Sequence, residues 1–194
     1  MLLHYNCYVL YLIHQHGAPP ATKRERRDMS TTLIYAVKQG EQPVFIGETR
    51  NAFRGAMYIW NDIAKRYFGL GGFPHFDDEM QRRVWNAGNE KPLTEAEMIV
   101  LASTMDKAVV EKAGVEKLLL AFNEYGPAHE NSSIQEQAEL ISGNADKVPD
   151  GYALAWIQTS VCGDGWFGMW DEETEVRICE LTGAFDVIEQ VCAA

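Results

Sequence analysis

Few side chains in this chain have the type and spacing that acid–base chemistry needs. The candidates are His75, in a glycine-rich loop before a predicted helix, the acids Asp77, Asp78 and Glu79 that follow it, and His129 much later in the chain. A lone histidine in such a loop is usually structural or solvated. No G-x-S-x-G, P-loop or H-E-x-x-H motif surrounds these residues. The sequence therefore favours a protein that is not an enzyme, with an unrecognised activity as the open alternative.

Metal and redox chemistry also lack their usual ligand spacings. The chain has four cysteines, none of them in a C-x-x-C pair: Cys7, Cys162, Cys179 and Cys192. A zinc ribbon and a thioredoxin-type motif are therefore excluded. His4, His14 and His16 have no carboxylate or cysteine companions at ligand spacing. We expect no metal and no cofactor, and sparse cysteines favour a reducing cytoplasm.

The segment Gly163–Glu175 combines large aromatic side chains with carboxylates. Exposed tryptophans beside acids are typical of a protein-binding patch, because the rings supply buried area and the acids select a basic partner. We predict a binding surface of two tryptophans and four acids: Trp166, Trp170, Asp171, Glu172, Glu173 and Glu175. The alternative is that the aromatic residues form the core of a hairpin and the acids its solvated rim.

Negative charge gathers at the same end of the chain. The formal net charge is -11, and from Asp150 onward nine acids are opposed only by Arg177. Such a surface repels phosphate backbones and attracts basic groups. We therefore expect a basic protein partner and no direct binding of nucleic acid. The alternative is a solvated acidic face that keeps the protein in solution.

The elements that position these residues begin with a hairpin. Two β-rich runs, 33–37 and 44–47, flank a turn that contains Gly40 and Pro43. Apolar spacing predicts one helix over 53–67 and another over 115–122, which should stop at 126–127. A further helix is predicted to start at Asp77 or Asp78. Capping boxes at 94–97 and 133–136 each predict the start of one more helix. Residues 106–112 fit a strand or a helix.

Strands return at 152–161, 166–169 and 175–181, and residues 185–191 close the chain as a short helix or strand. This order predicts an α+β fold. Its antiparallel sheet comes from the N-terminal hairpin and the C-terminal strands, and helices from the middle of the chain cover it.

Residues 1–28 differ from the rest of the chain. Their apolar run ends at Ile13, whereas a membrane-spanning helix needs about 20 apolar residues. The run also lacks a basic start and a small-residue cleavage site. We predict a loose N-terminal extension over 1–28, a single globular domain over 29–194, and no membrane partner.

The runs Leu33-Ile-Tyr35 and Phe45-Ile-Gly47, followed by Arg54, resemble the start of a GIY-YIG nuclease. In that family two tyrosines, an arginine and a distant glutamate support metal-assisted cleavage of a phosphodiester. The resemblance implies catalytic positions at Tyr35, Arg54 and Glu139. Phe45 stands where the family has its second tyrosine, and Leu33 where it has the first glycine.

With the runs 45–51 and 156–160, the predicted domain resembles the small accessory proteins of bacteriophages and prophages. Some of those block host defence, as anti-CRISPR and anti-restriction proteins do. The sequence thus predicts a non-enzymatic, acidic, protein-binding protein. By resemblance it is a phage-borne inhibitor that occupies the basic surface of a host nucleic-acid-handling protein. The alternative is a GIY-YIG-like metal-dependent nuclease, degenerate in its motif.

Overall fold

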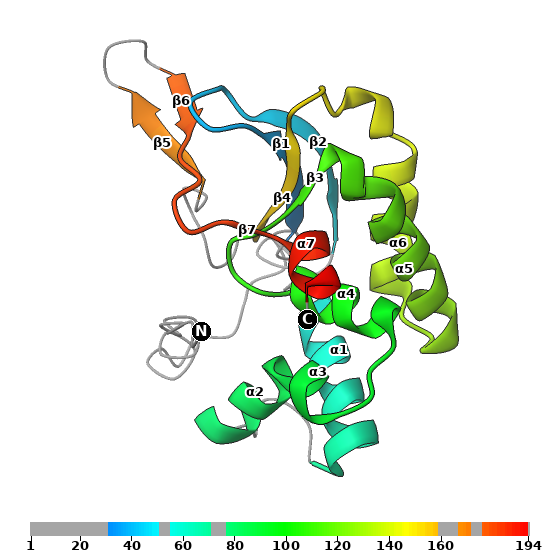
Figure 1. Cartoon of the computed structure of the whole chain (residues 1–194). Coiled ribbons are helices and arrows are strands. Elements are labelled where there is room, and N and C mark those ends of the chain that lie inside the picture. The colour runs from blue at the N-terminus through cyan, green and yellow to red at the C-terminus, as the bar shows by residue number, and fades with distance from the viewer. Residues whose placement is uncertain (1–30, 51–54, 71–76, 159–166, 172–175, 194) are drawn as a thin grey trace, which may run out of the picture.

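The computed structural model describes residues 31–50, 55–70, 77–158, 167–171 and 176–193, without side-chain detail for 158 and 169–171. A five-stranded sheet carries helices on one face, and a separate two-stranded sheet lies beyond its other face (Figure 1). The predicted α+β class is confirmed. Residues 1–28 lie outside the described parts, so the N-terminal extension stays a prediction.

The main sheet has the order β2-β1-β4-β3-β7, and every neighbouring pair is antiparallel except β3 and β7. Its strands come from both ends and the middle of the chain: β1 (Thr32–Val37), β2 (Val44–Thr49), β3 (Ala108–Glu111), β4 (Ala153–Gln158) and β7 (Phe185–Asp186). The second sheet is a hairpin of β5 (Gly168–Asp171) and β6 (Val176–Cys179). The sequence-predicted N-terminal hairpin is confirmed, and residues 106–112 contain a strand.

Side chains alternate between the two faces of the sheet along the central strands, and this divides the core into two layers. In β1, Ile34 faces the helices, whereas Val37 packs with residues of the β5–β6 hairpin. In β4, Leu154 and Trp156 face the helices, and the small Ala155 lies on the hairpin side. Because successive side chains point to opposite faces, both faces of the sheet are buried. The hairpin therefore completes the core on the side that the helices leave open.

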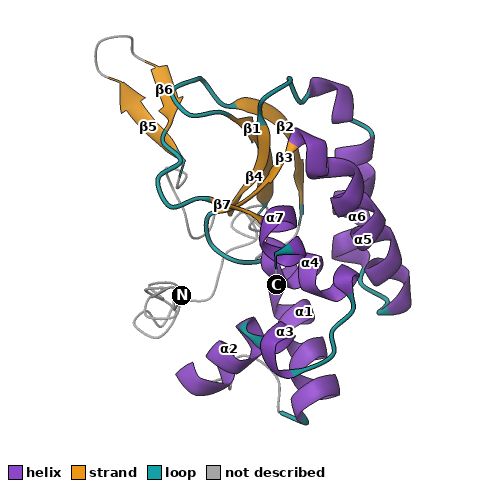
Figure 2. Ribbon diagram, viewed as in Figure 1, coloured by secondary structure: helices purple, strands orange, loops and turns teal. Residues whose placement is uncertain are grey.

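The helical layer holds most of the middle of the chain (Figure 2). Its helices are α1 (Ala56–Ile63), which continues as a π-helical turn over Ala64–Phe68, α2 (Asp78–Trp85), α3 (Ala87–Glu90), α4 (Glu95–Ser103), α5 (Val115–Ala128), α6 (Ser132–Ser142) and α7 (Val187–Cys192). Short 3-10 turns occupy Lys112–Gly114 and Ala145–Lys147. In the part of the chain that the structure describes, no helix has the length and apolar character needed to cross a bilayer.

Two predicted helix boundaries are wrong. α5 runs through Gly126 and Pro127 to Ala128. Pro127 has no N–H to donate to the carbonyl four residues back, and the helix ends one residue after it. A side chain at Gly126 would collide with Gln135 of α6, so the close packing of α5 and α6 requires a glycine at that position. The cap of α6 is Asn131, whose side chain accepts a hydrogen bond from the Ile134 N–H. The predicted box at 133–136 therefore lies inside the helix.

The box at the start of α4 is confirmed. The Thr94 hydroxyl accepts from the Glu97 N–H, and the Glu97 carboxylate accepts from the Thr94 N–H at 2.7 Å. Replacing Thr94 by Ala removes the first of these bonds, so we expect the free energy of unfolding to fall by about 1 kcal/mol. Urea unfolding followed by circular dichroism measures this. Thr94→Ser is the control because it keeps the hydroxyl, and equal losses in both variants would contradict the cap's role.

Candidate functional site

The predicted binding surface maps onto the β5–β6 hairpin. Trp170 and Asp171 belong to β5, where Trp170 pairs with Arg177 and Asp171 with Val176 across the hairpin. Trp166, Glu172, Glu173 and Glu175 lie outside the described residues, so their arrangement stays a prediction. In the chain, residues 172–175 connect β5 to β6, and five of the six predicted binding residues fall between positions 170 and 175.

The base of this hairpin is fixed to the main sheet. The Gly40 N–H, in the turn between β1 and β2, donates to the Cys179 carbonyl at 2.9 Å, and the Cys179 N–H donates to the Glu41 carbonyl at 2.7 Å. The Glu180 N–H donates to the Phe167 carbonyl at 2.7 Å. Phe167 and Cys179 are each 1% exposed. Phe167 is thus a core residue, as the alternative interpretation of the aromatic segment expected.

The nuclease-like positions lie in different layers. The Tyr35 ring contacts Phe45 and Phe167, with ring centroids 5.4 and 5.6 Å apart, on the hairpin side of the sheet. Glu139 is exposed on α6, a helix whose Ala138 packs in the core on the opposite side. The structure does not bring Tyr35 and Glu139 together, and Arg54 lies outside the described residues.

The acid–base candidates have structural surroundings where they are described. Asp77 caps α2 by accepting a hydrogen bond from the Met80 N–H at 2.8 Å, and Asp78 and Glu79 occupy the first turn of that helix. Acids there are favoured by the helix dipole. His75 lies outside the described residues. His129 alone joins a polar cluster.

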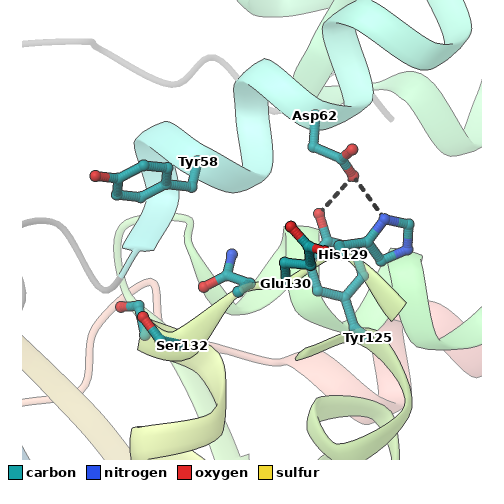
Figure 3. Close-up of a pocket in the computed structure, with 8 residues that line it drawn as sticks. Tyr58, Asp62, Tyr125, His129, Glu130 and Ser132 are labelled. Carbon is teal, nitrogen blue, oxygen red and sulfur yellow. Dashed lines mark hydrogen bonds and ion pairs between the residues drawn. The ribbon is translucent and has the colours of Figure 1, made fainter. Parts of the chain in front are cut away.

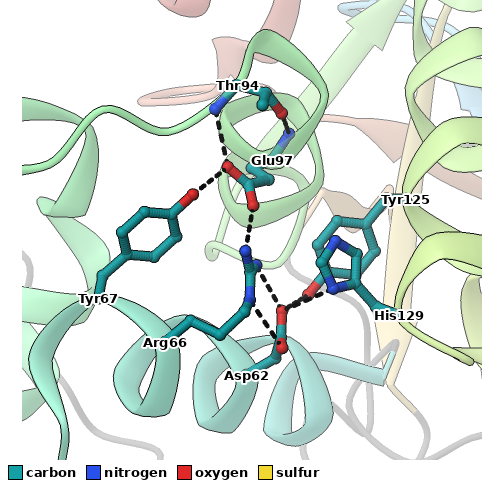
Figure 4. A network of polar contacts seen from close by, with 7 residues as sticks. All are labelled: Asp62, Arg66, Tyr67, Thr94, Glu97, Tyr125 and His129. Carbon is teal, nitrogen blue, oxygen red and sulfur yellow. Dashed lines mark hydrogen bonds and ion pairs between the residues drawn. The ribbon is translucent and has the colours of Figure 1, made fainter.

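That cluster centres on Arg66, which lies between two carboxylates (Figure 4). Its Nε and Nη2 atoms donate to the two oxygens of Asp62 at 2.9 and 2.6 Å. Its Nη1 atom donates to Glu97 Oε1 at 2.5 Å. The bidentate contact fixes the plane of the guanidinium, so one arginine links the end of α1 to the start of α4.

Glu97 is the more buried carboxylate, with a side chain that is 5% exposed. Its Oε2 atom accepts from the Tyr67 hydroxyl and from the Thr94 N–H, both at 2.7 Å. Burial acts to raise the pKa of Glu97, but the hydrogen bonds from Tyr67, Thr94 and Arg66 outweigh it and hold the pKa below its ordinary value. Burial and the bond to Glu97 raise the pKa of Tyr67.

Asp62 connects the cluster to α5. Besides Arg66, its Oδ2 atom accepts from the Tyr125 hydroxyl at 2.8 Å and lies 3.4 Å from Nδ1 of His129. Burial acts to raise the pKa of Asp62, but the bonds from Arg66 and Tyr125 outweigh it and lower the pKa. Burial and the bond to Asp62 raise the pKa of Tyr125 far above its ordinary value.

A pocket of about 280 Å³ opens beside Asp62 (Figure 3). It lies between α1, the C-terminal end of α5 and the first turn of α6, and it is lined by Tyr58, Asp62, Tyr125, His129, Glu130, Asn131, Ser132 and Ser133. Of these residues, only His129 was a candidate from the sequence. The four-residue spacing of Asp62 and Arg66 was a signal for their ion pair, but nothing in the sequence indicated the contacts to α4 and α5.

The pKa shifts of two acids and two tyrosines in this cluster make these four groups poorly suited to proton transfer near neutral pH. General acid–base catalysis needs a pKa near the working pH. The pKa values of Asp62 and Glu97 move down, and those of Tyr67 and Tyr125 move up, so all four move away from neutrality. Among the described residues, no group of three or more His, Cys, Asp or Glu side chains is placed to hold a metal ion.

The lowered pKa of Glu97 predicts a pH-dependent contribution to stability. Its ordinary value is 4.5, so the contribution is complete above that pH and is lost as the pH falls through the lower folded-state value. We expect Glu97→Gln to lower the free energy of unfolding by about 2 kcal/mol at about pH 7 and by much less at about pH 3. Urea unfolding of both proteins at a series of pH values measures the difference between their free energies of unfolding.

The control for this experiment is Glu95→Gln on the same helix. Glu95 pairs with Lys117 at 2.6 Å, but its side chain is 58% exposed. Exposed pairs of this kind contribute little, so this variant should stay close to the wild type throughout. If the difference in free energy of unfolding between Glu97→Gln and the wild type stayed constant on acidification, the role given to the Glu97 carboxylate would be contradicted.

Comparisons with protein-family models, with curated proteins and with solved structures found no match to this chain. Its function must therefore be inferred from the arrangement of its own residues. Two places in the structure are candidates: the β5–β6 hairpin with its acidic connection, and the pocket beside Asp62.

Proposed function

We propose that this protein is a non-enzymatic binding protein that uses the connection between β5 and β6 to hold a basic surface of a partner protein. The observation that carries the proposal is the way the hairpin is built. Its base is fixed to the main sheet, and its two strands pair only with each other among the described strands (Figure 1). The acid-rich residues follow the strands at the end away from that base.

The fixed base favours binding, because the two strands that hold the connection are already in place before contact and do not have to be ordered on association. Phe167, which directly precedes β5, belongs to the same buried cluster as Ala153 and Ala155 of β4. Cys179, at the end of β6, exchanges two backbone hydrogen bonds with the turn between β1 and β2. Both ends of the hairpin are thus held, while residues 172–175 connect the other ends of its strands.

The charge of the connection indicates the class of partner. Asp171, Glu172, Glu173 and Glu175 supply four negative charges within five residues. Carboxylates can occupy the positions that phosphate oxygens take on a basic surface, so a protein that handles nucleic acid is a suitable partner. The likeness to phage accessory proteins extends the proposal to a host defence protein whose basic groove is blocked.

Charge reversal at the connection tests this proposal. We expect the triple variant Glu172→Lys, Glu173→Lys, Glu175→Lys to lower the affinity for the partner at least about 10-fold at low salt, because each lysine would face a basic surface. The protein and the variant are immobilised and used to capture proteins from host lysate. Mass spectrometry identifies any basic protein retained by the wild type, and surface plasmon resonance with that purified protein measures the affinities.

A matched control reverses three exposed acids on the helical side: Glu116→Lys, Glu124→Lys, Glu136→Lys. It changes the net charge by the same amount, so it separates the position of the charges from their number. If both triple variants weakened binding equally, the hairpin would not be the contact surface. Retention of the partner by the hairpin variant would reject the proposal outright.

The nuclease resemblance makes the opposite prediction, so it can be tested independently. With Tyr35 enclosed by two aromatic rings and Glu139 on the other side of the sheet, we expect no nicking of supercoiled plasmid with magnesium or manganese. Agarose gels of wild type and Arg54→Ala would look alike. Metal-dependent nicking by the wild type that disappeared in Arg54→Ala would overturn the proposal of a non-enzymatic protein.

A further inference from the structure

β2 is an edge strand of the main sheet (Figure 1). Among the described strands it pairs only with β1, and α6 packs on one of its faces, at Gly47. About half of the backbone N–H and C=O groups of such a strand point away from its single neighbour. In the part of the chain that the structure describes, no strand bonds to those groups of β2, so this edge can accept one more strand.

The start of this edge strand carries exposed apolar side chains. Val44 is 36% exposed and Phe45 is 51% exposed. The Phe45 ring meets the Tyr35 ring of β1 edge to face, with the centroids 5.4 Å apart, so β1 covers only part of it. Proteins commonly protect an apolar edge of this kind, because it can otherwise pair with strands of other chains. A strand with apolar side chains beside β2 would cover the rest of Phe45.

The chain itself contains a segment with the properties that this edge requires. The segment Cys7–Ile13, which lies outside the described residues, is a run of seven apolar residues without a charge. Tyr8, Val9, Tyr11 and Ile13 are of the aromatic and β-branched types that favour strands. A continuous apolar run of this length is typical of a strand buried on both faces. It also matches β2, which has six residues, in length.

The position at which the chain enters the sheet brings this segment within reach of β2. β1 begins at Thr32, which pairs with Thr49 at the end of β2. Residues 14–31, which separate the apolar run from β1, can extend to about 60 Å. The edge of β2 is only about 20 Å long, so the run can lie along it in either direction.

The charge of the connection favours this occupant over a second copy of the chain. Residues 23–28 contain four cations and two acids, whereas the whole chain has a formal net charge of -11. The rest of the chain is therefore even more acidic, and it attracts the basic connection. A second copy would instead bring another 11 negative charges to the edge, and this opposes self-association through β2.

We propose that Cys7–Ile13 pairs with the free edge of β2 as a sixth strand of the main sheet and covers Phe45. The N-terminal part of the chain is then a strap that closes an exposed edge, in place of the loose extension that the sequence predicts. The inference is independent of the function proposed for the hairpin, because it concerns the edge of the main sheet and not the connection between β5 and β6.

Hydrogen exchange of backbone amides in the full chain, followed by NMR, tests the proposal. The amides of β2 that point away from β1 should exchange at least about 10-fold more slowly in the wild type than in the double variant Val9→Asp, Tyr11→Asp, because two carboxylates in the run oppose its burial. The amides of β2 that bond to β1 should exchange alike in both proteins, which shows that the sheet stays folded. Nuclear Overhauser effects from the Phe45 ring to side chains of the run identify the contact directly.

The matched control is the double variant His14→Asp, His16→Asp. It adds the same two carboxylates just beyond the apolar run, so it should keep the slow exchange of the wild type. This comparison separates the position of the new charges from their number.

Three results would overturn the inference. The first is fast exchange of the outward amides of β2 in the wild type, as a loose extension requires. The second is equally slow exchange in the wild type and in Val9→Asp, Tyr11→Asp, because another segment would then cover the edge. The third is slow exchange that is lost on about 10-fold dilution, because the occupant would then be a second copy of the chain.

Discussion

The burial of both faces of the central strands is the constraint on which the rest of the structure depends. β4 is apolar at successive positions, with Leu154 and Trp156 toward the helices and Ala153 and Ala155 toward the hairpin. A strand that is apolar on both faces is not stable with either face exposed to water, so other elements must cover both sides. The helices cover one side. The small side chains on the other leave room for Phe167, and this is why a two-stranded hairpin, rather than another layer of helices, is sufficient there.

The helical layer depends on a polar contact in addition to its apolar core. Arg66 bonds to Asp62 in α1 and Glu97 in α4, and Asp62 accepts a hydrogen bond from the Tyr125 hydroxyl of α5. A partly buried charge network of this kind is costly when incomplete, because each partner left alone loses its compensation. The contacts therefore specify how three helices meet, and the pocket lies where α1, the end of α5 and the start of α6 come together.

Sequence patterns identified those parts of the fold that depend on local interactions. The β-rich run of β1 with the turn after it, the apolar spacing of three and four in α1 and the capping box at Thr94 all depend on residues that are near neighbours in the chain. The cap at Ser133 was wrong although the true cap is also a local contact, in which the Asn131 side chain accepts a hydrogen bond from the Ile134 N–H. The stop at Pro127 was wrong because tertiary packing decided it, with α6 lying against Gly126. The polar network was missed because its bonds also depend on tertiary packing: they span 31 and 63 residues, from Arg66 to Glu97 and from Tyr125 to Asp62, and no spacing rule covers them.

The separation of the two candidate sites follows from the same topology. The sheet divides the molecule, so the acidic connection of the hairpin and the pocket beside Asp62 face different layers. The pocket is lined by residues of α1, α5 and α6 and of the connection between α5 and α6, and α6 packs against β2 of the main sheet. Gly47 of β2 lies directly under Leu140 of α6, where even a methyl group would collide. α5 packs against β3 in the same way, so the helices around the pocket contact the sheet at an edge strand and at an inner strand. The turn that follows β1 and leads into β2 exchanges backbone hydrogen bonds with the base of the hairpin, so packed elements join the two faces while the sheet keeps the two places apart.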